Sequence, residues 1–183
     1  AVSSDTYFYE IAANYDFRED FKRNTIQVAA AQFGFGRDTG SGLPGERAGI
    51  LPTADWVAAN YRSAALSRDY WILGDTVQMA VGQGMNQVTP LQLTNGYAAF
   101  VNGGNLLNPN VAKRITAGSD TAQLIRAVET RVVSKIPLEG DVPVLINEGL
   151  LAVVGESYKD GDLGTAYDAF HTPEKGGIEF PLD

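Results

Sequence analysis

The sequence predicts a mainly helical α+β fold with a few antiparallel strands. Several segments of the first half place apolar residues three or four positions apart, which is the spacing of one helix face. Two segments after residue 110 are instead rich in β-branched residues, which favour strands. The chain has 183 residues, of which 44% are hydrophobic and 20% are charged, so it fits one soluble globular domain or most of one.

Two helices and a long loop are predicted before residue 53. The first helix covers residues 6–14, and the second has an apolar face that finishes at Phe33, directly before Gly34. Residues 34–52 contain six glycines and two prolines, which interrupt regular structure. A loop of this length in a compact domain is often functional or packed on itself.

A short helix and a strand are predicted next. The helix covers residues 53–60, with Thr53 as its N-terminal cap. Val77, Met79 and Val81 alternate with polar or small residues, which is typical of a strand.

The best-defined helix of the sequence follows the glycine-containing turn Gly82-Gln83-Gly84. Thr89 can cap it, and Pro90 suits the first helical position because the missing N–H has no partner there in any helix. Asn102-Gly103-Gly104 ends it with residues that tolerate positive φ. One face is apolar and is expected to be buried; it consists of Leu93, Tyr97, Phe100 and Val101.

The second half carries weaker signals. Residues 111–115 and 124–136 are predicted as strands. Asp141 is expected to cap a helix that runs through Val154 and is closed by Gly155. Residues 156–183 are mostly irregular in pattern.

Composition excludes several classes of function. The formal charge of −8 argues against nucleic acid or an anionic membrane surface as the primary partner, since either requires a positive face. The absence of cysteine excludes disulfides and thiol chemistry and disfavours a structural zinc site. His171 is the only histidine, which excludes most histidine-based triads.

Three stretches in consistent order give the chain a family resemblance. The first is Gly82-Gln83-Gly84, Thr89-Pro90-Leu91-Gln92, Tyr97 and Asn102-Gly103-Gly104; the second is Phe33-Gly34-Phe35-Gly36, Thr39-Gly40, Leu43-Pro44-Gly45-Glu46 and Gly49-Ile50-Leu51-Pro52; the third is Gly74-Asp75-Thr76. Over residues 3–110 the sequence resembles the transpeptidase domain of class B penicillin-binding proteins. The resemblance implies a penicillin-binding transpeptidase or serine β-lactamase-like fold, and residues 1–183 would form part of that domain.

The resemblance also implies a catalytic cleft in which a Ser-x-x-Lys helix start, a Ser-x-Asn/Asp loop and a Lys-Thr-Gly strand meet. Ser3-Ser4-Asp5 matches the second element. Ser3 would bridge the nucleophilic serine and the lysine and help to relay the proton, while Asp5 would orient the lysine or the substrate amide. The other interpretation is that these residues merely cap the first helix.

The other two elements do not occur in the sequence. No serine has a lysine three positions on, and no Lys-Ser/Thr-Gly occurs. Gly164-Thr165-Ala166 lacks the lysine and Lys175-Gly176-Gly177 lacks the hydroxyl, so we interpret both as chance similarities. In the family the serine element lies upstream of Ser3, and the lysine strand follows a segment like Phe180-Pro181-Leu182.

Two further patterns are weak. Residues 34–40 nearly match a dinucleotide fingerprint, but one extra residue separates the last glycines and a helix, not a strand, precedes them. Trp56, Trp71 and Tyr70 are able to line a groove, although core packing is the simpler interpretation.

The resemblance therefore implies a part of a peptidoglycan D,D-transpeptidase, which forms a serine ester with the stem peptide or with a β-lactam and uses no metal and no cofactor. The full-length enzyme would lie on the extracytoplasmic face of the bacterial membrane and work with membrane-bound cell-wall synthesis proteins, while this chain alone would be inactive. The alternative is a non-catalytic module of similar fold that binds cell-wall peptide or a synthesis partner. Flanking sequence with both missing motifs would favour the enzyme.

Overall fold

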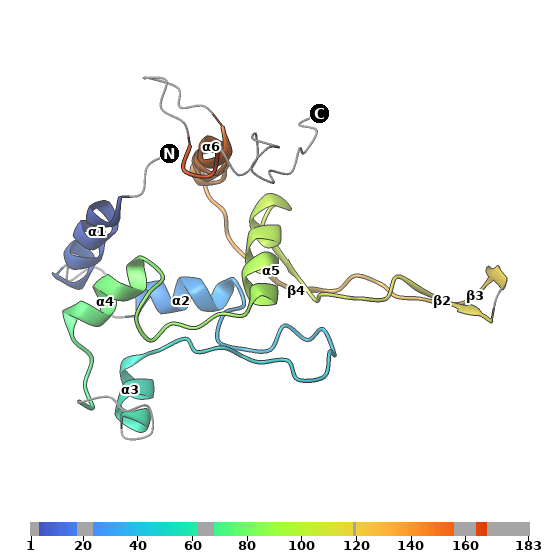
Figure 1. Ribbon diagram of the computed structural model, residues 1–183, viewed down its shortest axis with the longest axis horizontal. Helices are drawn as coiled ribbons and strands as arrows, with labels where there is room; N and C mark the ends of the chain where they lie inside the picture. Colours follow the sequence, from blue (N-terminus) through green and yellow to red (C-terminus); the bar gives the residue numbers. More distant parts are fainter. Residues whose placement is uncertain (1–3, 18–23, 62–67, 119, 156–163, 168–183) are drawn as a thin grey trace. The chain divides into compact units, whose positions relative to one another are not determined.

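The computed structural model describes residues 4–17, 24–61, 68–118, 120–155 and 164–167 (Figure 1). The chain divides into two compact units, one of Thr6–Pro137 and one of Ala1–Asp5 with Leu138–Asp183.

Six helices and four short strands occur in the described residues. The helices are α1 (Asp5–Phe17), α2 (Thr25–Gln32), α3 (Ala54–Asn60), α4 (Leu73–Ala80), α5 (Pro90–Val101) and α6 (Val142–Val154); the strands are β1 (Asn105–Leu107), β2 (Arg114–Ala117), β3 (Asp120–Ala127) and β4 (Val132–Lys135). β1 pairs with β4 and β2 pairs with β3, both antiparallel. The predicted mainly helical α+β class is confirmed.

The start of α5 follows the predicted capping chemistry. The Gln92 backbone N–H donates to Thr89 Oγ1 at 3.1 Å, and the Thr89 N–H donates to Gln92 Oε1 at 2.8 Å. Pro90 occupies the first turn. This reciprocal pair satisfies two donors that a helix start otherwise leaves unpaired, so the first turn is firmly positioned.

Replacing Thr89 by alanine is expected to lower the free energy of unfolding by about 1 kcal/mol, because the cap is lost while packing is kept. Thermal melts followed by circular dichroism measure the change. Thr94 lies exposed within the same helix, and its hydroxyl donates only to the Pro90 carbonyl. Thr94→Ala is therefore the matched control, with a change of less than about 0.5 kcal/mol. Equal losses in both variants would contradict the role of the cap.

The expected buried face of α5 was largely wrong. Leu93, Tyr97 and Val101 are 44%, 52% and 71% exposed. The buried positions are instead Gln92, Gly96 and Ala99, which share the next helical stripe. Small residues there let the backbone come close: a Cβ at Gly96 would lie 3.4 Å from Phe35 Cζ.

Phe100 belongs to the packed side of α5, although it is only half-buried. Its ring stacks on that of Phe33, with centroids 6.1 Å apart. Leu106 of β1 and Ile136, just after β4, are each 3% exposed and add the aliphatic part of this core.

Other boundaries also differ from the sequence prediction. Residues 73–80 form α4 and not a strand, because Asp75 accepts the Ile72 N–H and starts a helix there. β1 was not predicted. The expected strand over 124–136 is divided between β3 and β4, and β2 begins at Arg114 rather than at residue 111.

In the unit that contains α6, the helix ends at Val154 with Gly155 as its C-cap, as predicted, but the Asp141 side chain forms no capping hydrogen bond. Gly164 and Ala166 donate backbone hydrogen bonds to the Gly155 and Val153 carbonyls, so this short segment closes on the end of α6. None of the helices in the described parts of the chain combines the length and the apolar composition that crossing a membrane requires.

Candidate functional site

The predicted catalytic residues lie at the start of α1. Ser3 falls outside the described residues. Ser4 is half-buried, and Asp5 is exposed as the first residue of the helix. A carboxylate is favourable in this first turn because of the helix dipole. A helix cap and a Ser-x-Asp loop both require a helix start here, so the roles of Ser3 and Asp5 remain predictions.

The lysine-strand candidates are absent from the described strands. Lys175, the segment 180–182 and His171 fall outside the described residues. Gly164-Thr165-Ala166 lies in a turn after α6 rather than in a strand.

The side chain of Gln92 joins the long loop to α5. It is 1% exposed, and its Nε2 donates to the Arg37 carbonyl at 2.7 Å and to the Ala48 carbonyl at 2.8 Å. Its Oε1 accepts from the Thr89 N–H. One amide therefore satisfies three backbone groups, two from the loop and one from the helix start.

The C-terminal end of the long loop is fixed beside the side-chain amide of Gln92. Ile50 and Gln87 exchange backbone hydrogen bonds of 2.7 and 2.9 Å. Gly49 has φ +66°, and a Cβ there would lie 2.3 Å from the Gln87 carbonyl oxygen. Only glycine fits this close approach, which explains one glycine of the loop.

The carboxylate of Glu46 holds the tip of the loop together. Its Oε1 accepts from the Thr39 hydroxyl and from the Thr39 N–H, the latter at 2.7 Å, and its Oε2 accepts from the Ser41 hydroxyl at 3.0 Å. These bonds, led by the one from the Thr39 hydroxyl, lower the pKa of Glu46.

This lowered pKa predicts a pH-dependent loop. A group whose pKa is lowered by folding contributes stability above its unfolded pKa, near about 4.3 for glutamate, and loses it as the pH falls through the folded pKa. We expect Glu46→Gln to lower the melting temperature above about pH 5, and the difference from the unmutated chain should shrink as the pH falls below about 4. Glu10→Gln provides the control at an exposed position of α1, and it should change the melting temperature little at any pH. A constant difference across this pH range would contradict the prediction.

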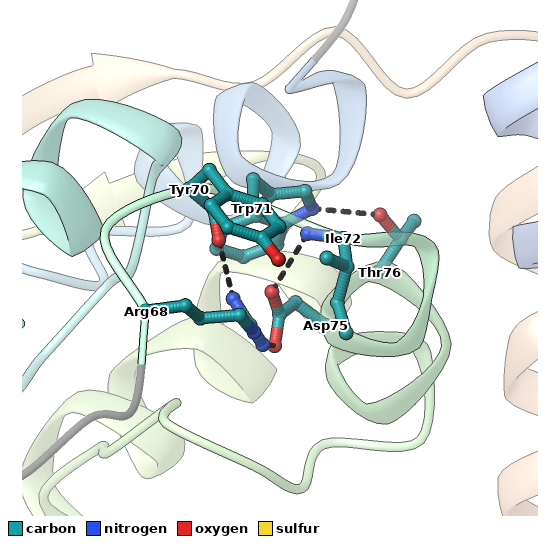
Figure 2. A network of polar contacts seen from close by, with 6 residues as sticks. All are labelled: Arg68, Tyr70, Trp71, Ile72, Asp75 and Thr76. Carbon is teal, nitrogen blue, oxygen red and sulfur yellow. Dashed lines mark hydrogen bonds and ion pairs between the residues drawn. The ribbon is translucent and has the colours of Figure 1, made fainter.

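A second polar network lies at the start of α4, as Figure 2 shows. Arg68 Nη2 lies 2.6 Å from Asp75 Oδ1, and the two side chains are 22% and 11% exposed. Asp75 Oδ2 accepts from the Ile72 N–H at 3.0 Å, so the same carboxylate caps the helix. Arg68 also donates to the Tyr70 carbonyl, and its guanidinium lies 5.8 Å from the centre of the Tyr70 ring.

Trp71 is fixed by this network rather than buried in a core. Its Nε1 donates to Thr76 Oγ1 at 2.9 Å (Figure 2). Beside it lies a cavity of about 100 Å³, lined by Pro52, Arg68, Trp71, Asp75, Gln78, Met79, Gln83, Gly84 and Met85. The alternative in which Trp71 lines a groove thus describes its position better than core packing does.

The described residues position backbone and helix ends and do not assemble a reaction centre of their own. Among them, no three His, Asp or Glu side chains lie together as a metal ion would require. The Gln92 and Arg68–Asp75 networks were not foreseen as networks. The spacing of Thr89 and Gln92 is that of a capping box, and this signal alone would have revealed the first of them.

Comparison with known proteins identifies the family. The family model for the penicillin binding protein transpeptidase domain matches residues 1–168. The peptidoglycan D,D-transpeptidase MrdA of Salmonella typhimurium is 28% identical over 174 residues, which is 95% of this chain and 25% of that protein. This chain thus spans about a quarter of the length of that relative.

Two solved structures share the fold. PBP2 of Pseudomonas aeruginosa is 27% identical with a TM-score of 0.65, over 90% of this chain and 32% of that one. PBP2 of Helicobacter pylori, solved in complex with MreC, is 25% identical with a TM-score of 0.60, over 92% of this chain and 26% of that one. Because the family model covers well over half of the sequence, this chain belongs to the family of penicillin-binding protein transpeptidase domains.

Proposed function

We propose that this chain acts as part of a peptidoglycan D,D-transpeptidase that cross-links stem peptides through a serine ester and is acylated by penicillin. The observation that carries the proposal is the family match over residues 1–168, which spans the Ser-x-Asp segment, the loop and the Thr-Pro-Leu-Gln helix in one order. The Salmonella relative, named a D,D-transpeptidase, matches nearly the whole chain.

The proposed reaction divides its work between this chain and flanking segments. The Ser-x-x-Lys helix start would supply the nucleophile and the lysine that takes its proton, and backbone N–H groups would stabilise the oxyanion. Ser3 would pass the proton between them, and Asp5 would orient the lysine or the substrate amide. The amide of Gln92 would contribute indirectly, by holding the loop of residues 34–52 on α5.

The relatives support a proposal for the cellular setting. They are bacterial cell-wall synthesis enzymes, and one of them has been solved with MreC. We propose that the full-length protein is anchored in the cytoplasmic membrane, acts on its outer face and associates with other membrane-bound cell-wall synthesis proteins.

The 183-residue chain alone is expected to form no covalent adduct with penicillin, because it contains neither Ser-x-x-Lys nor Lys-Ser/Thr-Gly. Mass spectrometry of the intact chain after incubation with penicillin tests this. The positive control is a full-length penicillin-binding protein that a fluorescent penicillin labels and that unlabelled penicillin protects. An adduct on the 183-residue chain would overturn the assignment of the nucleophile to another segment.

A non-catalytic module of similar fold, which binds cell-wall peptide or a synthesis partner, is the competing function. The full reading frame distinguishes the two. Both motifs, together with penicillin labelling, support the transpeptidase, whereas their absence from the frame and no labelling support a binding module.

A further inference from the structure

The β2–β3 hairpin and its stems, residues 110–137, expose several large apolar side chains. We call this segment the basic ribbon. Residues 110–115, 124–127 and 129–133 are all exposed. The apolar members include Val111 (78%), Ile125 (64%), Leu124 (56%) and Val132 (52%). In Figure 1, β2 and β3 form the tip of a two-stranded ribbon that continues from β1 and β4.

The basic ribbon also has the opposite charge from the rest of the chain. It contains five basic and two acidic residues, a formal charge of +3, whereas the whole chain carries −8 and the remainder therefore −11. Its basic residues are Lys113, Arg114, Arg126, Arg131 and Lys135. The Nζ of Lys135 donates to the Gly103 carbonyl at 2.6 Å. Among the described residues, the other four form no ion pair.

The strand register mixes these two kinds of side chain. Ile115 lies opposite Arg126, and Thr116 lies opposite Leu124. The register shifts on both sides of Thr116, so the ladder is irregular and offers a poor edge for a further strand. The side chains, not the backbone edges, are therefore the surface available to a partner.

We propose that the basic ribbon is a docking surface for an acidic, partly apolar segment of another protein. Exposed patches that combine apolar side chains with charge mark protein interaction sites. A polyanion would pair with the basic side chains but would leave the apolar side chains of Leu124 and Ile125 exposed to water. An anionic membrane would attract the ribbon and repel the remaining charge of −11.

A different explanation for the charges is protection against aggregation. Lysine and arginine on exposed strands prevent edge-to-edge association. Protection works with charges of either sign, whereas docking of an acidic segment requires positive charge. Reversal of the sign therefore separates the two explanations.

The test uses the 183-residue chain and a fluorescein-labelled decapeptide of alternating Glu and Leu, with binding followed by fluorescence anisotropy. Arg114→Glu with Arg126→Glu should weaken binding about tenfold, and the same variant should bind the alternating Lys-Leu decapeptide more tightly than the unmutated chain does. Arg37→Glu with Arg47→Glu makes the same charge change on the loop of residues 34–52 and should leave the affinity within about twofold. Leu124→Ser with Ile125→Ser should also weaken binding, by at least about fivefold.

Four outcomes would overturn the proposal. If charge reversal leaves peptide binding unchanged and the chain stays monomeric, the basic side chains serve to prevent aggregation and not to bind a partner. Equal weakening by the control pair would mean that net charge alone matters. Poly-glutamate binding as tightly as the Glu-Leu peptide would indicate a polyanion site, and tighter binding to phosphatidylglycerol vesicles would indicate a membrane surface. Circular dichroism shows whether the charge-reversal variant is folded. If it is unfolded, Arg114→Gln with Arg126→Gln replaces it, and this neutral variant should weaken peptide binding about threefold.

Discussion

Replacing Gln92 by alanine is expected to destabilise the chain by about 3 kcal/mol or more. The Gln92 amide satisfies the Arg37 and Ala48 carbonyls and the Thr89 N–H, and it is 1% exposed. These backbone groups are partly buried, so each is expected to lose about 1 kcal/mol, the lower end of the roughly 1–3 kcal/mol that a buried unpaired group costs. Urea denaturation followed by circular dichroism measures the loss.

The control is the exposed Gln32, at the end of α2. Gln32→Ala also removes a side-chain amide, but from an exposed position, and it should change the free energy of unfolding by less than about 0.5 kcal/mol. A loss below about 1 kcal/mol for Gln92→Ala would mean that water replaces the amide fully and that the loop does not depend on it.

Gln92→Glu refines the same prediction, because it keeps the shape and removes the donors. Above neutral pH the buried carboxylate would face two carbonyls, so its folded pKa would be raised above the unfolded value. Ionisation then costs more in the folded state, and stability is lost as the pH rises through the raised pKa. As the pH falls, protonation restores one donor, and part of the stability should return. A variant that is as stable as the unmutated chain at pH 8 would contradict the donor role of Gln92.

Local chemistry made some elements predictable. Thr89 and Pro90 define the start of α5 through a cap and a fixed φ, and both signals act within one turn. The start of α3 at Thr53 has the same basis, since the Thr53 hydroxyl accepts the Trp56 N–H. The bounds of α6 were predicted by its apolar spacing and by Gly155.

Features that depend on tertiary contacts were not predictable from the pattern. The apolar stripe at Leu93, Tyr97 and Val101 is the more hydrophobic one, yet the helix buries Gln92 and Gly96. The loop of residues 34–52 requires a side-chain amide and a close backbone approach on this face of α5. A hydropathy pattern contains no information about either requirement. The alternation of Val77, Met79 and Val81 predicted a strand here. The residues form α4 instead, because the Asp75 side chain caps the start of a helix.

The candidate site was predictable only through the order of its motifs. Ser3 and Asp5 are two polar residues before a helix, and their spacing alone cannot separate a cap from a catalytic loop. The Arg68–Asp75 ion pair joins residues seven positions apart across a turn, which no sequence period marks.

The Ser3→Ala substitution, made in the full-length protein that contains this chain, is expected to slow acylation by penicillin at least about 100-fold. Loss of a group that transfers a proton in the transition state costs roughly 10²–10⁴ in rate. Folding should change little, because a helix cap contributes only about 1 kcal/mol. The acylation rate constant, measured by rapid mixing with a fluorescent penicillin, gives the effect directly, and melting curves report the fold.

The neighbouring Ser4 supplies the matched control, since it is half-buried next to Asp5 and is not the residue that the Ser-x-Asp motif assigns. Ser4→Ala should acylate within a few-fold of the unmutated enzyme. If Ser3 only caps α1, Ser3→Ala would lower the melting temperature and leave the acylation rate nearly unchanged. A large loss of rate at constant melting temperature, confined to Ser3, is the pattern that a proton-relaying hydroxyl requires and a cap cannot produce.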